Sequence, residues 1–231
     1  MAKHVAAANA LADAGLLSEA LGRLALATAI DEQSFEVRAN EALLLSELLD
    51  KGEHGVVVDG KTTVVNTSAV SNAFQLALAL NPGWADGWFN LGNAQNQGQD
   101  AISSFQKAIQ LSPKFADAHN NISICYQKSR ELEPAIKHGN IAVQLEPSNS
   151  QYVHNLASYL HQAGSFTAAL KLAQRATKLN PDNWLPKQLL AAILKDSNQP
   201  DASAVAAKVL EQALRCKGLS SEVRLTTVMA V

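Results

Sequence analysis

The sequence predicts an all-helical protein built from tandem copies of one helix-turn-helix unit. The first observation is a proline spacing, because Pro113, Pro147 and Pro181 lie 34 residues apart. The second is that alanines lie twelve and five residues before each of these prolines. The third is the composition, which is 47% hydrophobic but only 5% aromatic and suits helices packed along small residues. Internal repeats of this length indicate a helical solenoid.

Each copy of the repeat is predicted to contain two helices. In the copy that ends at Pro113, residues 88–95 follow the i, i+3, i+4, i+7 spacing of a helix face, and Gly98 interrupts it before a second helix. This copy is three residues shorter between Gly92 and Ala101 than the two that follow. We therefore expect its second helix to lose most of a turn.

Small residues recur where the two helices of a pair are expected to face each other. A small side chain lets two helix backbones approach closely, while larger neighbours fill the space beside it. The pattern therefore indicates packing, not catalysis. These residues are Gly92, Ser123 and Ala157 in the first helices and Ala101, Ala135 and Ala169 in the second.

The repeats weaken toward both ends of the 231-residue chain. Its length corresponds to about six repeats plus a partial one, which we expect to form a single superhelical domain over residues 1–231. Residues 219–231 look like the first helix of a further repeat and end on apolar side chains. This predicts a chain truncated at its C-terminus, or one that binds a partner or a second copy through this end.

One segment, residues 51–67, departs from the helical pattern. β-branched residues flank Asp59-Gly60, a pair that favours a two-residue type I′ turn because both turn residues need positive φ. We expect a β-hairpin inserted between the two helices of the second repeat. It is either a surface decoration without a role or a docking edge whose unpaired backbone groups accept another strand.

The unit resembles the tetratricopeptide repeat, a 34-residue helix-turn-helix module with Trp, Leu-Gly, Tyr, Ala, Phe, Ala and Pro at set positions. The resemblance is strongest over residues 84–181. It implies an all-α, right-handed solenoid of antiparallel helix pairs in which the first helix of each pair lines a concave groove. It also implies a scaffold for protein-protein interaction, not an enzyme, that binds a partner protein or an extended peptide in this groove.

An asparagine column is the main candidate for peptide binding. Asn90, Asn121 and Asn155 each precede the apolar residue that packs the first helix of a repeat. An Asn side chain both donates and accepts hydrogen bonds, so it can bond the backbone of an extended peptide without reading its side chains. The column resembles the asparagine ladder of the O-linked N-acetylglucosamine transferase superhelix, and the alternative is a solvated helix face. The same face is predicted to add Asn93, Gln127, His154, Ser158 and His161.

Charge and motif content argue against several other classes. The chain has 19 Lys and Arg against 21 Asp and Glu, and the net charge of −2 without a basic cluster argues against nucleic acid. No apolar run approaches the ~18 residues of a membrane span. His154 and His161 are two helical turns, about 10 Å, apart, which is too far for one zinc ion. With only two cysteines and no metal or cofactor motif, we expect a cytoplasmic protein without a cofactor.

Two further hypotheses remain open at this point. The chain is alternatively the substrate-recruiting arm of a larger glycosyl-, sulfo- or methyltransferase whose catalytic domain lies outside this sequence. In line with this, we find no catalytic triad pattern, carboxylate pair or phosphate-binding loop in it. The other hypothesis is an architectural subunit that binds a copy of itself through its groove or its end.

Overall fold

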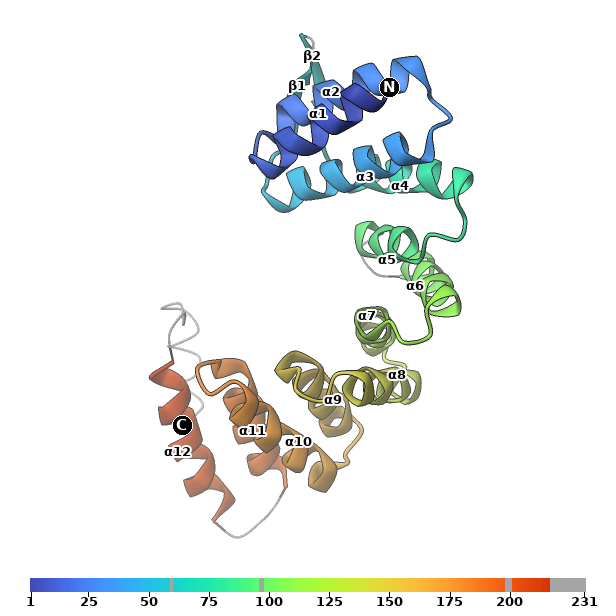
Figure 1. Cartoon of the computed structure of the whole chain (residues 1–231). Coiled ribbons are helices and arrows are strands. Elements are labelled where there is room, and N and C mark those ends of the chain that lie inside the picture. Colours follow the sequence, from blue (N-terminus) through green and yellow to red (C-terminus); the bar gives the residue numbers. More distant parts are fainter. Residues whose placement is uncertain (59, 96–97, 198–200, 217–231) are drawn as a thin grey trace. The chain divides into compact units, whose positions relative to one another are not determined.

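The computed structural model describes the chain except residues 59, 96–97, 198–200 and 217–231. Its described part contains twelve helices and one β-hairpin, which confirms the predicted all-α class with a small hairpin (Figure 1). None of these helices is both long and apolar enough to cross a membrane. The helix predicted within 219–231 lies outside the described residues. The chain divides into two compact units, one over Met1–Ala118 and one that begins at His119.

The first unit consists of three consecutive helix pairs and the hairpin. A continuous hydrophobic core runs through the first two pairs and includes the fully buried Leu24, Leu48 and Phe74. Each helix therefore contributes one apolar face to a core that it shares with its neighbours. The helices are α1 (Ala2–Asp13), α2 (Leu17–Ile30), α3 (Phe35–Asp50), α4 (Thr67–Leu80), α5 (Ala85–Ala94) and α6 (Gln99–Leu111).

Trp84 joins the third pair of the first unit to the second pair. It is the N-cap residue of α5, and its ring packs edge-on against Phe35 of α3, with 5.4 Å between ring centroids. The same ring lies 5.9 Å from the ring of Phe74 on α4. Aromatic contacts of this kind bury a large apolar area in a defined geometry. Trp84 thus wedges neighbouring repeats together.

The short copy of the repeat loses its three residues from the first helix. Helix α5 has 10 residues, whereas the corresponding helix of the 150–183 repeat has 13; α6 has 13 residues against 14 in α8 and α10. The sequence-based expectation of a shortened second helix is therefore wrong. The reason is that α6 buries Ala101 and Phe105 against α5, so it cannot shed a turn without exposing them. A Cβ on Gly92 would lie 2.6 Å from the Phe105 ring, which shows how closely the two helices approach.

The hairpin predicted within residues 51–67 is present. Strands β1 (Gly55–Val58) and β2 (Lys61–Val64) pair antiparallel between α3 and α4, and Val58 pairs with Lys61. This register leaves a two-residue loop in which Gly60 has φ of +74°, a conformation that glycine adopts without strain. Val56 is buried and Val57 is 65% exposed, so side chains alternate between the side of β1 that meets α2 and solvent.

The second unit repeats the same pairing of consecutive helices. Asn149 and Asn183 lie two residues after the repeat prolines, and their side chains accept hydrogen bonds from the first backbone N–H groups of α9 and α11. Ala135 and Ala169 are fully buried, as the packing pattern predicted. The helices are α7 (Ala116–Lys128, in this unit from His119), α8 (Leu132–Leu145), α9 (Ser150–Gln162), α10 (Phe166–Leu179), α11 (Trp184–Asp196) and α12 (Ala202–Leu214).

A pair of histidines joins α7 to α8. The Nδ1 atoms of His119 and His138 lie 3.0 Å apart and the two rings stack. The ring of Tyr126 also stacks on the ring of His138. One Nδ1 must donate and the other must accept, so both Nδ1 atoms cannot carry a proton at once. Burial, then the charges of His119 and Lys137, lower the pKa of His138 to about 4.

We expect this pair to make the folded state acid-sensitive. The unfolded pKa of a histidine is about 6.5, so between this value and the folded value the unfolded chain binds more protons than the folded chain. The free energy of unfolding should therefore fall as the pH decreases through this window, with no further contribution below it. Urea titrations at several pH values should show a shallower decline for His138→Gln than for the exposed control His54→Gln. Equal declines would contradict this role of His138.

Candidate peptide-binding surface

The first helices of the pairs in the second unit carry a set of mainly polar side chains. Helices α9 and α11 are in direct contact, and hydrogen bonds join α7 to α9. Each helix starts one repeat after the last, so equivalent residues are brought side by side. We call this set the α7–α9–α11 surface. It comprises Asn120, Asn121, Gln127, Gln151, His154, Asn155, Ser158, His161, Gln162, Gln188, Leu189, Ala192, Lys195 and Asp196.

A chain of amide hydrogen bonds crosses this surface from α9 to α7. Gln151 Nε2 donates to Asn155 Oδ1 over 3.0 Å, and Asn155 Nδ2 donates to Asn120 Oδ1 over 2.9 Å. Asn120 Nδ2 then donates to Asn121 Oδ1 over 3.1 Å. The structure therefore brings the predicted Asn121 and Asn155 into one network through Asn120, which is buried and was not among the predicted binding residues. Fixed partners hold each amide plane in a single orientation.

Two more side-chain contacts join neighbouring first helices across this surface. Gln127 Nε2 donates to Gln162 Oε1 over 3.0 Å, and Gln162 Nε2 donates to Ser158 Oγ over 3.2 Å. His161 Nε2 lies 2.7 Å from Asp196 Oδ2. Asn120 and Asn155, Gln127 and Gln162, and His161 and Asp196 are each 35 residues apart. This near-repeat spacing means that neighbouring first helices bond to each other across the surface at equivalent positions.

A serine and a tyrosine support the surface from behind. Ser123 is fully buried on α7, donates to the Asn120 backbone carbonyl, and its Oγ lies 3.2 Å from the Tyr159 hydroxyl on α9. Burial raises the pKa of Tyr159 to about 12, so its hydroxyl stays protonated at neutral pH and available for this bond. The contact fixes the separation of α7 and α9 beneath the amide chain.

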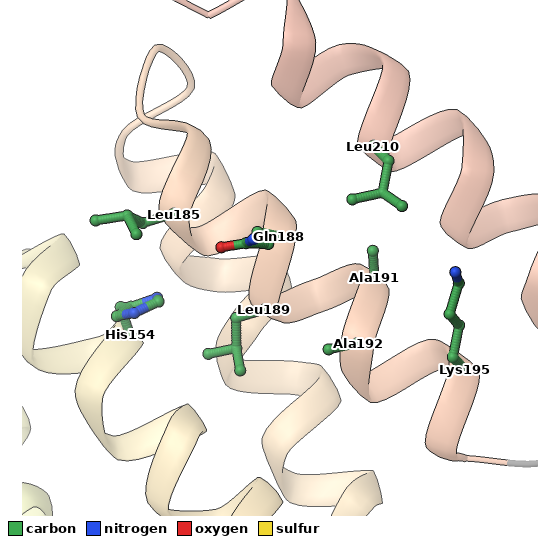
Figure 2. Close-up of a pocket in the computed structure, with 8 residues that line it drawn as sticks. All are labelled: His154, Leu185, Gln188, Leu189, Ala191, Ala192, Lys195 and Leu210. Carbon is green, nitrogen blue, oxygen red and sulfur yellow. The ribbon is translucent and has the colours of Figure 1, made fainter. Parts of the chain in front are cut away.

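A largely apolar pocket of about 430 Å³ continues the surface onto α11 (Figure 2). His154 of α9 lies at one end with Leu185 and Leu189, and Leu210 of α12 points toward Ala191 at the other. Burial lowers the pKa of His154, so the ring is neutral at pH 7. Its Nδ1 atom is buried without a hydrogen-bond partner in the described structure. Gln188, Ala192 and Lys195 complete the lining.

The α11 part of this surface was missed by the sequence reasoning. Gln188, Leu189, Ala192 and Lys195 lie 34 residues after His154, Asn155, Ser158 and His161. Extending the column by one more repeat would have found them. The signal was hidden because the asparagine of the column is replaced by Leu189, so the polar pattern that defined the column stops at α9.

Asn90 and Asn93, the two remaining predicted residues, lie on α5 in the first unit. Asn90 is partly buried and Asn93 is exposed. Asn90 occupies the repeat position that corresponds to Asn121. Because α5 belongs to the first unit, neither Asn90 nor Asn93 is counted in the α7–α9–α11 surface. In the part of the chain that the structure describes, no group of three or more His, Cys, Asp or Glu side chains is placed to hold a metal ion.

Comparison with known proteins agrees with this architecture. A family model described as a tetratricopeptide repeat matches residues 150–183, which span α9 and α10. No curated protein matches the chain.

Several solved structures share the fold at low sequence identity. YrrB, described as a TPR protein with an unusual peptide-binding site, has a TM-score of 0.67 at 15% identity over 89% of this chain and 97% of its own. The pilF protein of Pseudomonas aeruginosa has a TM-score of 0.69 at 15% identity over 98% and 96%. A MamA crystal structure has a TM-score of 0.65 at 17% identity over 75% and 94%. With the paired helices and the 34-residue spacing, these matches identify the chain as a protein of the tetratricopeptide-repeat fold.

Proposed function

We propose that the chain is a protein-interaction scaffold whose second unit binds an extended peptide across the α7–α9–α11 surface. The observation that carries this proposal is the amide chain from Gln151 through Asn155 and Asn120 to Asn121. Each primary amide has two N–H donors, and the bond that Asn155 donates uses one of them. A second donor is therefore held in a fixed direction on a partly exposed residue.

Fixed amides suit recognition of a peptide backbone. An extended peptide presents alternating carbonyl and N–H groups, and an asparagine side chain can complement either. Because the amides are already oriented by their neighbours, little side-chain entropy is lost when the peptide binds. The YrrB structure, which shares the fold, is described as having a peptide-binding site, so the fold is compatible with this use.

The pocket beside His154 adds a place for an apolar side chain of the peptide. Its lining is mainly aliphatic, and its volume of about 430 Å³ exceeds the size of one leucine or phenylalanine side chain. The amide chain would hold the peptide backbone, while the pocket would select among side chains. The surface carries few charges, so the affinity should depend only weakly on salt.

Removing one amide should weaken peptide binding by about tenfold, the value of one or two hydrogen bonds. A peptide is first selected from a random display library on the intact chain, and its affinity is then measured by fluorescence anisotropy for Asn155→Ala and for the Asn121→Ala/Asn155→Ala double variant. The matched control is Asn140→Ala, because Asn140 is exposed on α8 and bonds only its own helix at the Ile136 carbonyl. Unchanged affinity in the Asn155 variants, or an equal loss in the control, would contradict the proposal.

A further inference from the structure

A buried lysine and a cysteine face each other at the contact between α11 and the end of α12. Lys187 Nζ donates to Cys216 Sγ over 3.1 Å and also to the backbone carbonyl of Pro181. Lys187 is 6% exposed and Cys216 is 8% exposed. The two residues are 29 positions apart, so the fold, not local sequence, brings them together.

The surroundings of this pair are unusual for a lysine. Its two acceptors are a backbone carbonyl oxygen and the Cys216 sulfur, and neither is a carboxylate. Among the ion pairs of the described residues none includes Lys187, although a buried lysine is ordinarily paired with a carboxylate. The α7–α9–α11 surface does not use it either. The Cys216 thiol also lies within hydrogen-bond distance of the Pro181 and Gln212 backbone carbonyls, so the structure holds an amine and a thiol together at one buried place.

We propose that Lys187 and Cys216 are an oxidative modification site that forms a sulfenamide cross-link, with hydrogen peroxide as the oxidant. A sulfenic acid is known to condense with a neighbouring nitrogen or thiol to a reversible product. Here the neighbouring nitrogen is the Lys187 amine at 3.1 Å, which needs only a small movement to reach the sulfur. Because the amine is already in contact with the sulfur, its attack on the sulfenic acid competes well with a second peroxide molecule from solution.

The reaction balances in two steps. The Cys216 sulfur attacks one oxygen of hydrogen peroxide, the O–O bond breaks, and the thiol proton leaves with the departing hydroxide as water. This step oxidises the sulfur by two electrons and reduces the peroxide. After the Lys187 ammonium has passed one proton to water, the amine attacks the sulfur, the S–O bond breaks, and the leaving hydroxide takes a second proton from the nitrogen as a second water. The net change in the chain is the loss of two hydrogens and the gain of one S–N bond.

Such a bond would tie α11 to the end of α12. It closes a covalent loop across the α11–α12 pair, and cross-links of this kind restrict the unfolded chain and raise the midpoint of thermal unfolding. Added thiol would reverse it, because a thiol attacks the sulfur and releases the amine. Oxidation would therefore stabilise the helix pair that forms one end of the pocket beside His154.

The test treats the whole chain, carrying Cys125→Ser so that Cys216 is its only cysteine, with hydrogen peroxide and measures its intact mass. We expect a product two hydrogens lighter than the reduced chain, a linked peptide containing both Lys187 and Cys216 after digestion, and return to the starting mass with dithiothreitol. Lys187→Met should abolish the product, whereas Lys171→Met on the exposed face of α10 should not.

Three results would overturn the proposal. They are a Cys216 that resists peroxide, a Cys216 that goes directly to sulfinic or sulfonic acid with Lys187 unlinked, and a loss of two hydrogens that persists in Lys187→Met. Peptide mapping with Lys187 intact gives the answer even if the Lys187 variant fails to fold. The mass measurement needs no bound peptide, so failure of this proposal and failure of the proposed peptide binding are distinguishable.

Discussion

Replacing Phe74 by alanine should destabilise the first unit by about 3–5 kcal/mol, the largest effect that we expect from any single substitution considered. Phe74 is fully buried on α4, belongs to the core that spans the first two helix pairs, and contacts the Trp84 ring. Its removal therefore leaves a cavity and also loosens the wedge between neighbouring repeats. Urea unfolding followed by circular dichroism measures the loss.

The control for this substitution lies on the same helix. Leu76 is 52% exposed, so Leu76→Ala should change the free energy of unfolding by no more than about 0.5 kcal/mol. Hydrogen exchange adds a local readout, because each repeat contacts mainly its neighbours. Protection should fall in α3, α4 and α5 and stay the same in α9 and α10. A uniform loss of protection along the chain would show that the repeats unfold as one block.

Enlarging a small residue at a helix contact should also be costly. Ala169→Leu or Ala135→Leu should destabilise by roughly 1–3 kcal/mol, because added methylene groups overpack a close helix approach. Both alanines are fully buried, and Ala169 shares a core cluster with Ala157 and Ala173. Leucine has at least as good a helix propensity as most residues, so the loss would come from packing and not from the helix itself.

Lys171→Ala is the matched comparison for Ala169→Leu, since Lys171 is exposed on the same helix. The melting temperature of the Lys171→Ala variant should equal that of the original sequence within experimental error. Similar losses for the buried and the exposed change would mean that the small-residue positions do not mark the helix contacts. That outcome would remove the basis on which the repeats were aligned.

The fold was predictable because its causes are local and repeated. The 34-residue spacing fixes each helix pair independently, and Gly60 lies with positive φ beside the last strand pair, Val58 and Lys61. The error at α5 arose because the sequence shows that three residues are missing but not which helix gives them up. That choice depends on burial of Ala101 and Phe105 against α5, a tertiary contact.

The candidate site was predictable only in part. Side-chain type and helix position placed Asn121 and Asn155 on one face, but the link between them runs through Asn120, whose burial and bonding depend on the packing of α7 against α9. The pocket was missed because aliphatic residues on α11 look like core in the sequence. Lys187 and Cys216 are 29 residues apart and share no motif, so only the packing of α11 against the end of α12 brings them together.

The most direct test of peptide binding on the α7–α9–α11 surface is to record the side-chain amide NMR signals of asparagine and glutamine during titration with a selected peptide. These signals report on the groups that are proposed to bind. Our account predicts that the signals of Gln151, Asn155 and Asn120 shift together in proportion to the bound fraction, while the signal of Asn140 on α8 stays in place. Shifts confined to the hairpin strands β1 and β2, with the three amides unmoved, would contradict it.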